Sequence, residues 1–341
     1  MKKSGIALCL VICLLFSGCA GKTEEKAEAG YTAPKVVQDD GVITSGKIDV
    51  SDENKQKVQT KEGDILVVED YSKDFIAVTA ENTFTVFDLN LSVENGEGDR
   101  SYAERFKALM KLLVQANPDI MTFQEVGANW MDYIVTMLKD IYDYYLIYPD
   151  SADKTIANPI FFKKEKFKDL TGGCFWLSDT PDQESAVSSG AGKYNCMWMQ
   201  LEDRKSGNAV YVFNAQLGGN EQEIQKGAAV IKEKCESIGW SKPIVCNLDL
   251  GLTKESQAAQ TLLEKFADAN DKNNQTATSH QYTGKGSVCD FSFYTKMTLR
   301  ADSYSVITDR PTGIFVSDHS PLLIQYTLNT EALDYSGEFI F

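Results

Sequence analysis

The sequence predicts an α/β protein in which layered β-sheets are covered by helices. Segments with strand-like alternation and segments with helical spacing follow each other along most of the chain. The strands come in hairpin-length groups with helices between the groups, a pattern typical of packed sheets and not of a barrel of βα repeats. Hydrophobic residues make up 43% of the 341 residues, which suffices for one large core or two smaller ones.

The first half of the predicted fold begins with TFTVFDLNL (83–91), which alternates like a strand. Ser101 and Glu104 form a capping-box pattern that opens a helix, and apolar residues follow at helical spacing until Pro118 ends it. The next predicted elements are a strand at 119–126, a helix at 129–140 and a strand at 159–167.

The second half follows the same rules. A helix at about 220–238 has one apolar face and ends at Gly239, and a shorter helix lies near 258–266. Further strands are predicted at 196–202, 208–217, 244–250, 289–295 and 321–328.

The first nineteen residues predict an export signal. A basic start (MKK) precedes the apolar run GIALCLVICLLF, and LFSGC resembles the bacterial lipobox, in which the cysteine, here Cys19, is lipidated and becomes the new N-terminus. An uncleaved membrane anchor is the alternative, but the apolar stretch is too short to span a bilayer comfortably. We therefore expect an exported protein that is anchored through Cys19 to the outer face of a bacterial membrane.

The rest of the chain divides by composition. Residues 20–62 are charged and rich in small residues, without an apolar period, and they predict a flexible tether. The folded domain is predicted at 63–330 and a C-terminal tail at 331–341.

Charge argues against nucleic acid as a partner. The formal net charge is −15, and it becomes about −17 when Lys2 and Lys3 leave with the signal. No stripe of lysine and arginine is visible, and an acidic surface repels phosphate backbones. A bound divalent cation would reverse the sign of the charge locally.

The cysteines do not predict a metal ribbon. Cys9 and Cys13 leave with the signal and Cys19 takes the lipid, which leaves five of the eight. Five is an odd number and no C-x-x-C spacing occurs, so a zinc ribbon is unsupported. We expect buried free thiols, and the sequence leaves a disulfide among them open.

Several predicted strands end on polar side chains that suit a hard cation. Because strand side chains alternate, the two polar residues of FNAQL share one face, as do those of CNLDL. Carboxylates with carboxamides suit Mg²⁺, Mn²⁺ or Ca²⁺ better than Zn²⁺, and two histidines are too few for a multi-histidine site. The candidate side chains are Asn90, Glu125, Asn214, Gln216, Asn247, Asp249, Asp290, Asp318 and His319.

Such a set would serve phosphoester hydrolysis. A metal held by Glu125, Asn90 and Asp318 would polarise a phosphoryl oxygen. His319, oriented by Asp290, would move a proton or hydrogen-bond the phosphate. Taken singly, each residue also has an ordinary explanation as a solvated rim, turn or structural residue, and only their order along the chain favours a site.

That order resembles the endonuclease/exonuclease/phosphatase superfamily, with the deoxyribonuclease I-like fold. The resemblance runs from about Phe84 to Tyr326 and rests on the segments FDLNL, PDIMTFQEV, NPIFFKKEKF, FWLSDTPD, FNAQL, PIVCNLDL, CDFSFY and VSDHSPLLI. It implies a four-layer sandwich: two mixed sheets packed face to face, helices outside, and a site at one end. The segment FWLSDTPD is similar to sequences of a secreted bacterial branch of the family, which is related to sugar-phosphate and lipid phosphoesterases.

The resemblance carries over unevenly. Six residues match the family's pattern: Asn90, Glu125, Asn214, Asp290, Asp318 and His319. At the next strand the family usually reads Gly-Asp-Phe-Asn, whereas here Asn247 comes before Asp249. Gln216 stands where the family has a histidine that steadies the phosphate, and Ile156 where that histidine's glutamate partner is expected. Gln200 takes a place often held by arginine.

These departures predict weak or altered catalysis. Exchange of Asn247 and Asp249 would move the carboxylate by about 6.5–7 Å along the strand, beyond the reach of a general base. Gln216 supplies neither positive charge nor a proton.

Three functions remain open. The chain is a metal-dependent phosphoesterase acting on a small or lipid-linked phosphate ester, or a degenerate member that binds a metal or phosphorylated ligand without cleaving it, or a lipid-anchored scaffold without a site. The lipid headgroup or small molecule, the oligomeric state and the metal are not specified by the sequence.

Overall fold

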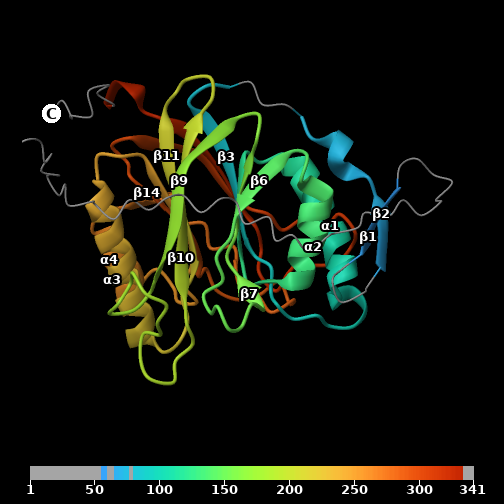
Figure 1. The fold of residues 1–341 in the computed structure, drawn as a ribbon, viewed down its shortest axis with the longest axis horizontal. Coiled ribbons are helices and arrows are strands. Elements are labelled where there is room, and N and C mark those ends of the chain that lie inside the picture. Colours follow the sequence, from blue (N-terminus) through green and yellow to red (C-terminus); the bar gives the residue numbers. More distant parts are fainter. Residues whose placement is uncertain (1–54, 60–64, 77–79, 333–341) are drawn as a thin grey trace, which may run out of the picture. The chain divides into compact units, whose positions relative to one another are not determined.

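Two six-stranded mixed β-sheets form the centre of the fold (Figure 1). The computed structural model describes residues 55–59, 65–76 and 80–332. In sequence order, the first sheet contains β3 (Thr83–Asn90), β4 (Ile120–Gln124), β6 (Tyr142–Tyr145), β8 (Ile160–Lys163), β15 (Leu299–Val306) and β16 (Leu322–Leu328). The second contains β9 (Phe167–Trp176), β10 (Asn195–Asp203), β11 (Ala209–Gln216), β12 (Ile244–Asp249), β13 (Ala267–Asp268) and β14 (Asp290–Tyr294).

Each sheet contains one parallel pair of strands joined by a helical crossover. The spatial orders are β15-β16-β3-β4-β8-β6 and β13-β14-β12-β11-β10-β9. β3 and β4 are parallel and joined through α1 (Tyr102–Ala116), and β11 and β12 are parallel and joined through α3 (Glu221–Ile238). The Ser101 side chain accepts from the Glu104 backbone N–H, as the capping pattern predicts, and Asn220 with Glu223 forms a full capping box on α3.

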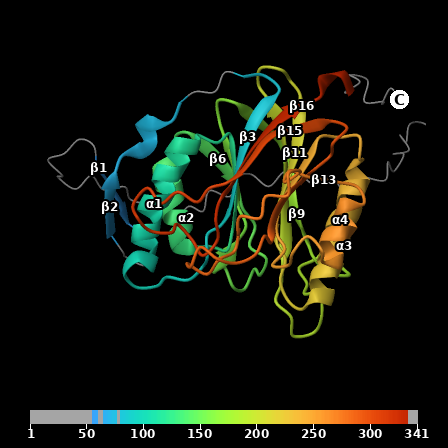
Figure 2. The ribbon, with the colours of Figure 1, turned by 180° about the vertical axis from the view of Figure 1, so that it is seen from behind.

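The helices cover the outer faces of the two sheets. α1 and α2 (Ala128–Leu138) pack on the first sheet, and α3 and α4 (Gln257–Leu263) pack on the second (Figures 1 and 2). A third apolar cluster lies between the sheets and takes residues from both. The predicted class, two mixed sheets face to face with helices outside, is therefore confirmed.

The space between the sheets changes character along the strands. Phe84 and Val86 on β3, with Val210 and Val212 on β11, make the apolar half. On the same faces, two residues further along both strands and four further along β3, the side chains are polar but still buried. The side chains of this polar half include Asp88, Asn90, Thr122, Gln124, Asn214, Asn247, Asp249, Asp290 and Ser292. The sandwich thus has one dry end and one polar end.

Some elements differ from the predicted ones. Lys55–Gln59 forms β1 and pairs with β2 (Ile65–Glu69), so the predicted tether is wrong for residues 55–59. The hairpin packs against the α1–α2 layer through alternate apolar residues of its strands. The stretch 159–167 is two strands separated by a turn, because β8 ends at Lys163 and β9 begins at Phe167. The strands β6 and β15 and the short strands β5 (Val126–Gly127), β7 (Ile156–Ala157) and β13 were not predicted.

The predicted signal peptide, Cys19, the tether up to residue 54 and the tail from residue 333 lie outside the described residues. Within the described ranges, no helix is long and apolar enough to cross a membrane. All five cysteines expected to remain after export are free, and all but Cys174 are buried, as predicted.

Candidate active site

The first group of site residues is joined by the side chain of Asn90, at the end of β3. Its Nδ2 donates to Glu125 Oε1 at 3.1 Å and to Asp249 Oδ2 at 2.8 Å. Its Oδ1 accepts from the Ser92 backbone N–H at 2.8 Å, which fixes the orientation of the amide. Its oxygen is turned away from the two carboxylates, and metal binding by Asn90 stays a prediction. Asn90 holds the carboxylates of two sheets together.

Glu125 follows β4 and has a left-handed backbone, with φ of 52°. Such a conformation is uncommon outside glycine. It occurs where the carboxylate meets donors from three segments. Oε1 accepts from Asn90 and from Gln216 Nε2, and Oε2 accepts from the Val93 backbone N–H at 3.3 Å. The strained turn positions Glu125 at the polar end of the sandwich.

The second group surrounds His319. Its Nδ1 lies 3.0 Å and 3.1 Å from the two carboxylate oxygens of Asp290. Ligand atoms of Asp249, Cys289, Asp290 and His319 all lie within 4.8 Å of one another, and all four residues are buried. The backbone N–H groups of Cys289 and Asp290 both donate to Thr278 Oγ1, which holds the start of β14 in place. We call Asn90, Glu125, Asp249, Asp290 and His319 the rim site.

Electrostatics sets the protonation of the rim site. Burial opposes the charge on His319, but Asp290, through its charge and hydrogen bond, raises the pKa of the imidazole to about 10. Burial also disfavours ionised Asp290, yet His319 holds its pKa below the ordinary value. Burial and the neighbouring Asp290 raise the pKa of Asp249 to about 7. At neutral pH the site therefore holds an ion pair beside a carboxyl that is close to its titration midpoint.

Asp318 reaches the same end of the sandwich through Ser317. Ser317 Oγ lies 2.7 Å from the Asn90 carbonyl oxygen and 3.1 Å from Asp318 Oδ1. Asp318 Oδ2 accepts from Gln281 Nε2 at 3.3 Å. Segments separated by some 230 positions in the chain thus meet at one rim, as expected from the sequence. The direct approach of Asp318 to Glu125 stays a prediction.

Two predicted catalytic residues, Asn214 and Asn247, form structural hydrogen bonds below the rim. Asn214 is fully buried and its Nδ2 lies within 2.8–3.1 Å of the carbonyl oxygens of Phe123, Asn158 and Pro159. Asn247 is also fully buried, and its Nδ2 donates to Thr122 Oγ1 at 3.0 Å across the sheets. Their amides link the two sheets below the rim, and catalytic roles for them stay a prediction.

The structure also corrects the register of CNLDL. The exchange of Asn247 and Asp249 was expected to displace the carboxylate, but Asp249 bonds Asn90 and belongs to the His319 cluster. Asp249 therefore reaches the rim although it follows Asn247, and if it takes the place of the carboxylate in the Gly-Asp-Phe-Asn pattern, the matching segment is Leu248-Asp249-Leu250-Gly251. In that register, Gly251 stands where the pattern has its asparagine. Gly251 has φ of 61°, and its N–H donates to Asp249 Oδ1 at 2.9 Å.

The other departures have distinct positions. Gln216 lies level with Asp249 on the neighbouring strand and donates to Glu125, so it occupies the rim. Ile156 pairs with Gly127, two residues after Glu125. Gln200 pairs with Tyr211, five residues before Gln216 on β11, and is therefore far from the rim. An arginine at position 200 would not reach the rim site, so its absence does not weaken the site.

Several contributors were missed by sequence reasoning. Cys289, Ser317, Thr278 and the Val93 N–H all touch rim residues. Cys289 and Ser317 adjoin predicted residues and could have been included on that ground. Thr278 and Val93 lie in loops whose closeness depends on the fold, and no sequence signal marks them.

The donor set fits a hard divalent cation. Glu125 and Asp249 offer carboxylate oxygens, while His319 Nδ1 is already engaged by Asp290. Burial and Asp290 raise the pKa of the Cys289 thiol far above its ordinary value, so the sulfur is protonated and ill suited to a soft metal. The rim site carries three carboxyl groups against one imidazole, and a cation would offset this excess.

Comparison with known proteins gives a match in structure only. No protein-family model matches the chain, and no curated protein sequence matches it. An endonuclease/exonuclease/phosphatase from Bacteroides vulgatus is 21% identical with a TM-score of 0.67, over 73% of this chain and 100% of that chain. A mannosyl-6-phosphatase from Bacteroides thetaiotaomicron is 21% identical with a TM-score of 0.64, over 72% and 99%. D. rerio TDP2 complexed with a single-strand DNA product is 16% identical with a TM-score of 0.58, over 72% and 100%. The chain therefore has the fold of the endonuclease/exonuclease/phosphatase superfamily.

Proposed function

We propose that the chain is a divalent-metal-dependent phosphoesterase that hydrolyses a small phosphate ester. The observation that carries this proposal is the convergence of Glu125, Asp249, Asp290 and His319 at one end of the sandwich, with Asn90 joining the first two. One solved structure with this fold is a mannosyl-6-phosphatase.

The rim residues divide the chemistry among them. Asp249 accepts a proton from the attacking water, for which a pKa of about 7 is well matched to neutral pH. As the water oxygen bonds to phosphorus and the ester P–O bond breaks, protonated His319, held by Asp290, supplies a proton to the leaving oxygen. Asn90 keeps Asp249 and Glu125 at a constant separation. When bound, Mg²⁺ or Mn²⁺ would neutralise charge on the phosphoryl oxygens, and Glu125 is the residue placed to hold it.

A small ester suits the chain better than nucleic acid does. TDP2 is solved with a DNA product, but this chain has a net charge of −15, and such a charge repels a phosphate backbone. A phosphomonoester, free or on a lipid headgroup, presents less charge and is a compatible substrate.

The proposal places the protein outside the cell. The lipobox-like LFSGC supports lipidation of Cys19 and attachment to the outer face of a bacterial membrane. Cys19→Ser should move the protein from the membrane fraction to the soluble fraction, and an unchanged distribution would contradict the anchor.

A second candidate is binding without cleavage. Gln216 and Gly251 support it, because neither can provide charge or a proton to the phosphate. The chain would then hold a metal or a phosphorylated ligand at the rim site and release no phosphate.

One experiment separates these functions. Phosphate release from a panel of monoesters is measured with Mg²⁺ or Mn²⁺, together with the melting temperature with and without the metal. Turnover that is lost in Glu125→Gln supports the esterase. A metal-dependent rise in melting temperature without turnover supports the binder. Absence of both effects supports the scaffold. Glu202→Gln, on β10 and outside the rim site, is the matched control.

A further inference from the structure

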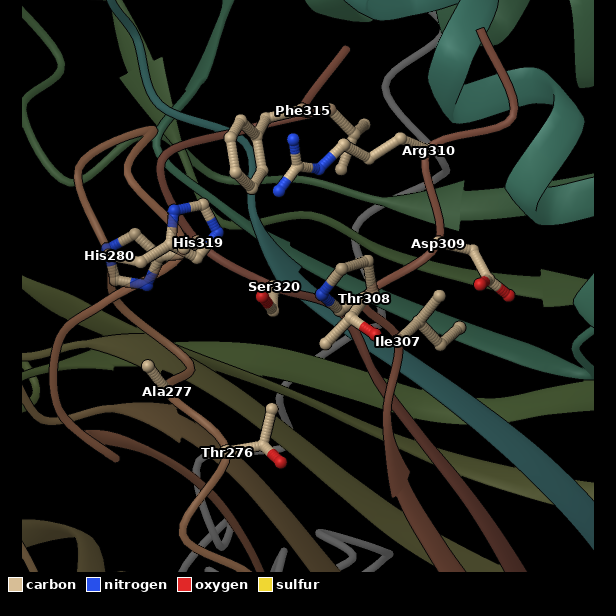
Figure 3. Close-up of a pocket in the computed structure, with 13 residues that line it drawn as sticks. Thr276, Ala277, His280, Ile307, Thr308, Asp309, Arg310, Phe315, His319 and Ser320 are labelled. Carbon is tan, nitrogen blue, oxygen red and sulfur yellow. The ribbon is translucent and has the colours of Figure 1, made fainter. Parts of the chain in front are cut away.

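A pocket next to the rim site has His319 in its wall, and its other lining residues lie outside the rim site (Figure 3). It measures about 100 Å³. Its walls come from the loop around His280, from the β15–β16 connection with Arg310 and Phe315, and from Ser320. Because one water occupies about 30 Å³, this volume admits a few polar groups and not a long chain. We call this cavity the His280 pocket.

The imidazole of His280 lacks hydrogen-bond partners. The residue is 2% exposed, and neither ring nitrogen has a partner among the described residues. The backbone is well held, because His280 N donates to the Asp318 carbonyl oxygen at 2.8 Å. The ring packs on Phe315 with 4.6 Å between centroids. Buried polar groups are nearly always paired, so an unpaired ring in the wall of a cavity indicates that the partner comes from outside the chain.

Arg310 adds a second set of free donors. Its guanidinium carbon lies 3.6 Å from the centroid of the Phe315 ring, and it forms no ion pair with another described residue. Figure 3 shows the guanidinium beside that ring, on the side away from the two histidines, with the Asp309 carboxylate further from them. The hydroxyls of Thr276, Thr308 and Ser320 also line the pocket.

The donors and acceptors favour hydroxyl groups. Burial and the nearby His319 lower the pKa of His280, so the ring is neutral and offers one donor and one acceptor. A ligand hydroxyl matches both, whereas phosphate and carboxylate oxygens only accept. Arg310 can donate to hydroxyl oxygens, and the ring of Phe315 and the side chain of Ile307 suit the C–H groups of a sugar.

We propose that the His280 pocket binds the hydroxyl-bearing alcohol part of a polyol phosphate, either a free sugar phosphate or the phosphorylated polyol headgroup of a lipid. The proposal rests on the proposed esterase function for the role of the phosphate, but binding of the polyol is independent of it. The pocket would place the alcohol next to His319, the residue assigned to protonate the leaving oxygen.

The test compares two esters in three variants. Glucose 6-phosphate carries hydroxyls, and 4-nitrophenyl phosphate carries none. His280→Phe removes both nitrogens but keeps a ring on Phe315, and Arg310→Ala removes the guanidinium. Arg300→Ala, an exposed arginine paired with Asp302 at the other end of β15, controls for loss of charge. We expect KM for glucose 6-phosphate to rise about tenfold in the first two variants, with KM for 4-nitrophenyl phosphate changed less than about twofold. His280→Phe should melt no lower than the wild type, because it removes an unpaired polar group.

Other outcomes overturn the proposal. Equal losses on both esters would make the residues part of the rim site, and unchanged KM in both variants would leave the pocket without a role. If the wild type cleaves neither ester, the proposed function fails, and the pocket is judged by binding of methyl α-glucoside in saturation-transfer NMR. Binding that is lost in His280→Phe supports the pocket, and absent binding, or displacement only by inorganic phosphate, rejects it. Faster release from soluble inositol 1-phosphate than from vesicles of phosphatidylcholine with phosphatidylinositol 4-phosphate would identify a free substrate, and the reverse a lipid.

Discussion

Two buried charge clusters lie at opposite ends of the parallel strands β3 and β4. At the start of β4, Asp119 is 2% exposed and its two oxygens lie 3.5 Å and 3.4 Å from Lys163 Nζ and Lys166 Nζ. Thr85 also donates to Asp119 through its backbone N–H at 3.0 Å. At the other end, the rim site sets three carboxyl groups against one imidazole. The first cluster has one carboxylate against two lysines, and both lysines also donate to backbone carbonyl oxygens of the chain. The second cluster has an excess of carboxyl groups, which the chain compensates only in part.

This difference separates stability from function. A buried charge is tolerated where the fold supplies its counter-charge and hydrogen bonds. The Asp119 cluster meets that condition and should matter to folding alone. The rim site does not meet it, and the strained φ of Glu125 adds to its cost. A site that binds an external cation and phosphate would require uncompensated charge of this kind, with its cost in folding stability, at one end of the sandwich.

The largest expected effect is on catalysis at the rim. Asp249→Asn keeps the shape and can keep the contact with Asn90 but removes the base, so phosphate release should fall by about 10²–10⁴-fold. Stability should change little, because the relief of a buried carboxylate is offset by loss of the hydrogen bond from the Gly251 N–H. Steady-state kinetics and thermal melting check both. Asp203→Asn, in the β10–β11 turn, should lower the melting temperature and leave kcat unchanged. Equal activity of Asp249→Asn and wild type would refute the assigned base.

Mutation of the Asp119 cluster should lower stability and leave activity unchanged. Asp119→Ala leaves two buried lysines without a counter-charge, and the free energy of unfolding should fall by about 3–5 kcal/mol. Activity per folded molecule should not change. Urea unfolding measures the loss. Asp143→Ala breaks an exposed pair with Lys164 and should cost about 0–1 kcal/mol. A loss as small for Asp119→Ala would mean that the two ends do not differ.

Asp88 lies between the two clusters, and it provides a test through the dependence of folding stability on pH. It is buried under the rim, and burial raises its pKa to about 7 against the hydrogen bonds of Thr122 and Gln124. Between pH 4 and 7 the folded state keeps a proton that the unfolded state releases, so stability should fall as pH rises. Asp88→Asn should reduce this slope, with the part due to Asp249 remaining, and be more stable at pH 8 by about 2–4 kcal/mol. Denaturation curves from pH 4 to 8 test it, with Asp99→Asn, an exposed residue of the 3₁₀ turn before α1, as control. Parallel slopes in wild type and Asp88→Asn would show that Asp88 is ionised throughout.

Sequence patterns predicted the faces of the strands better than the depth of each residue. Asn90, Glu125, Asp290 and His319 were recovered because each closes a strand or adjoins one. Asn214 and Asn247 point to the same inner face as Gln216 and Asp249 but lie two residues deeper. Alternation gives the face, while depth depends on register between strands far apart in the chain. The same limit caused the misplaced exchange in CNLDL.

Edge strands were missed for a different reason. β15 is an edge strand whose side chains are mostly exposed or half-buried, so it lacks a clear apolar alternation. β6 is the other edge of that sheet and contains three tyrosines in four residues. Their conformation is set by pairing with β16 and β8 and not by a local pattern.

The smallest expected effect is a gain at the rim. Gly251 has a left-handed backbone, and nothing lies within 4 Å of a Cβ built there. Asparagine tolerates that conformation, so Gly251→Asn should fold and return an amide beside Asp249. Gln216→His would add a second phosphate ligand. Together they should raise kcat about tenfold, since lost phosphate contacts of this kind cost at least that much. Gly207→Asn, in the open β10–β11 turn with φ of 73°, is the matched control. The double variant could bind metal and melt like the wild type but gain no rate. That result would show that weak phosphate contacts do not limit hydrolysis, and the uncompensated charge at the rim would then be explained by cation binding alone.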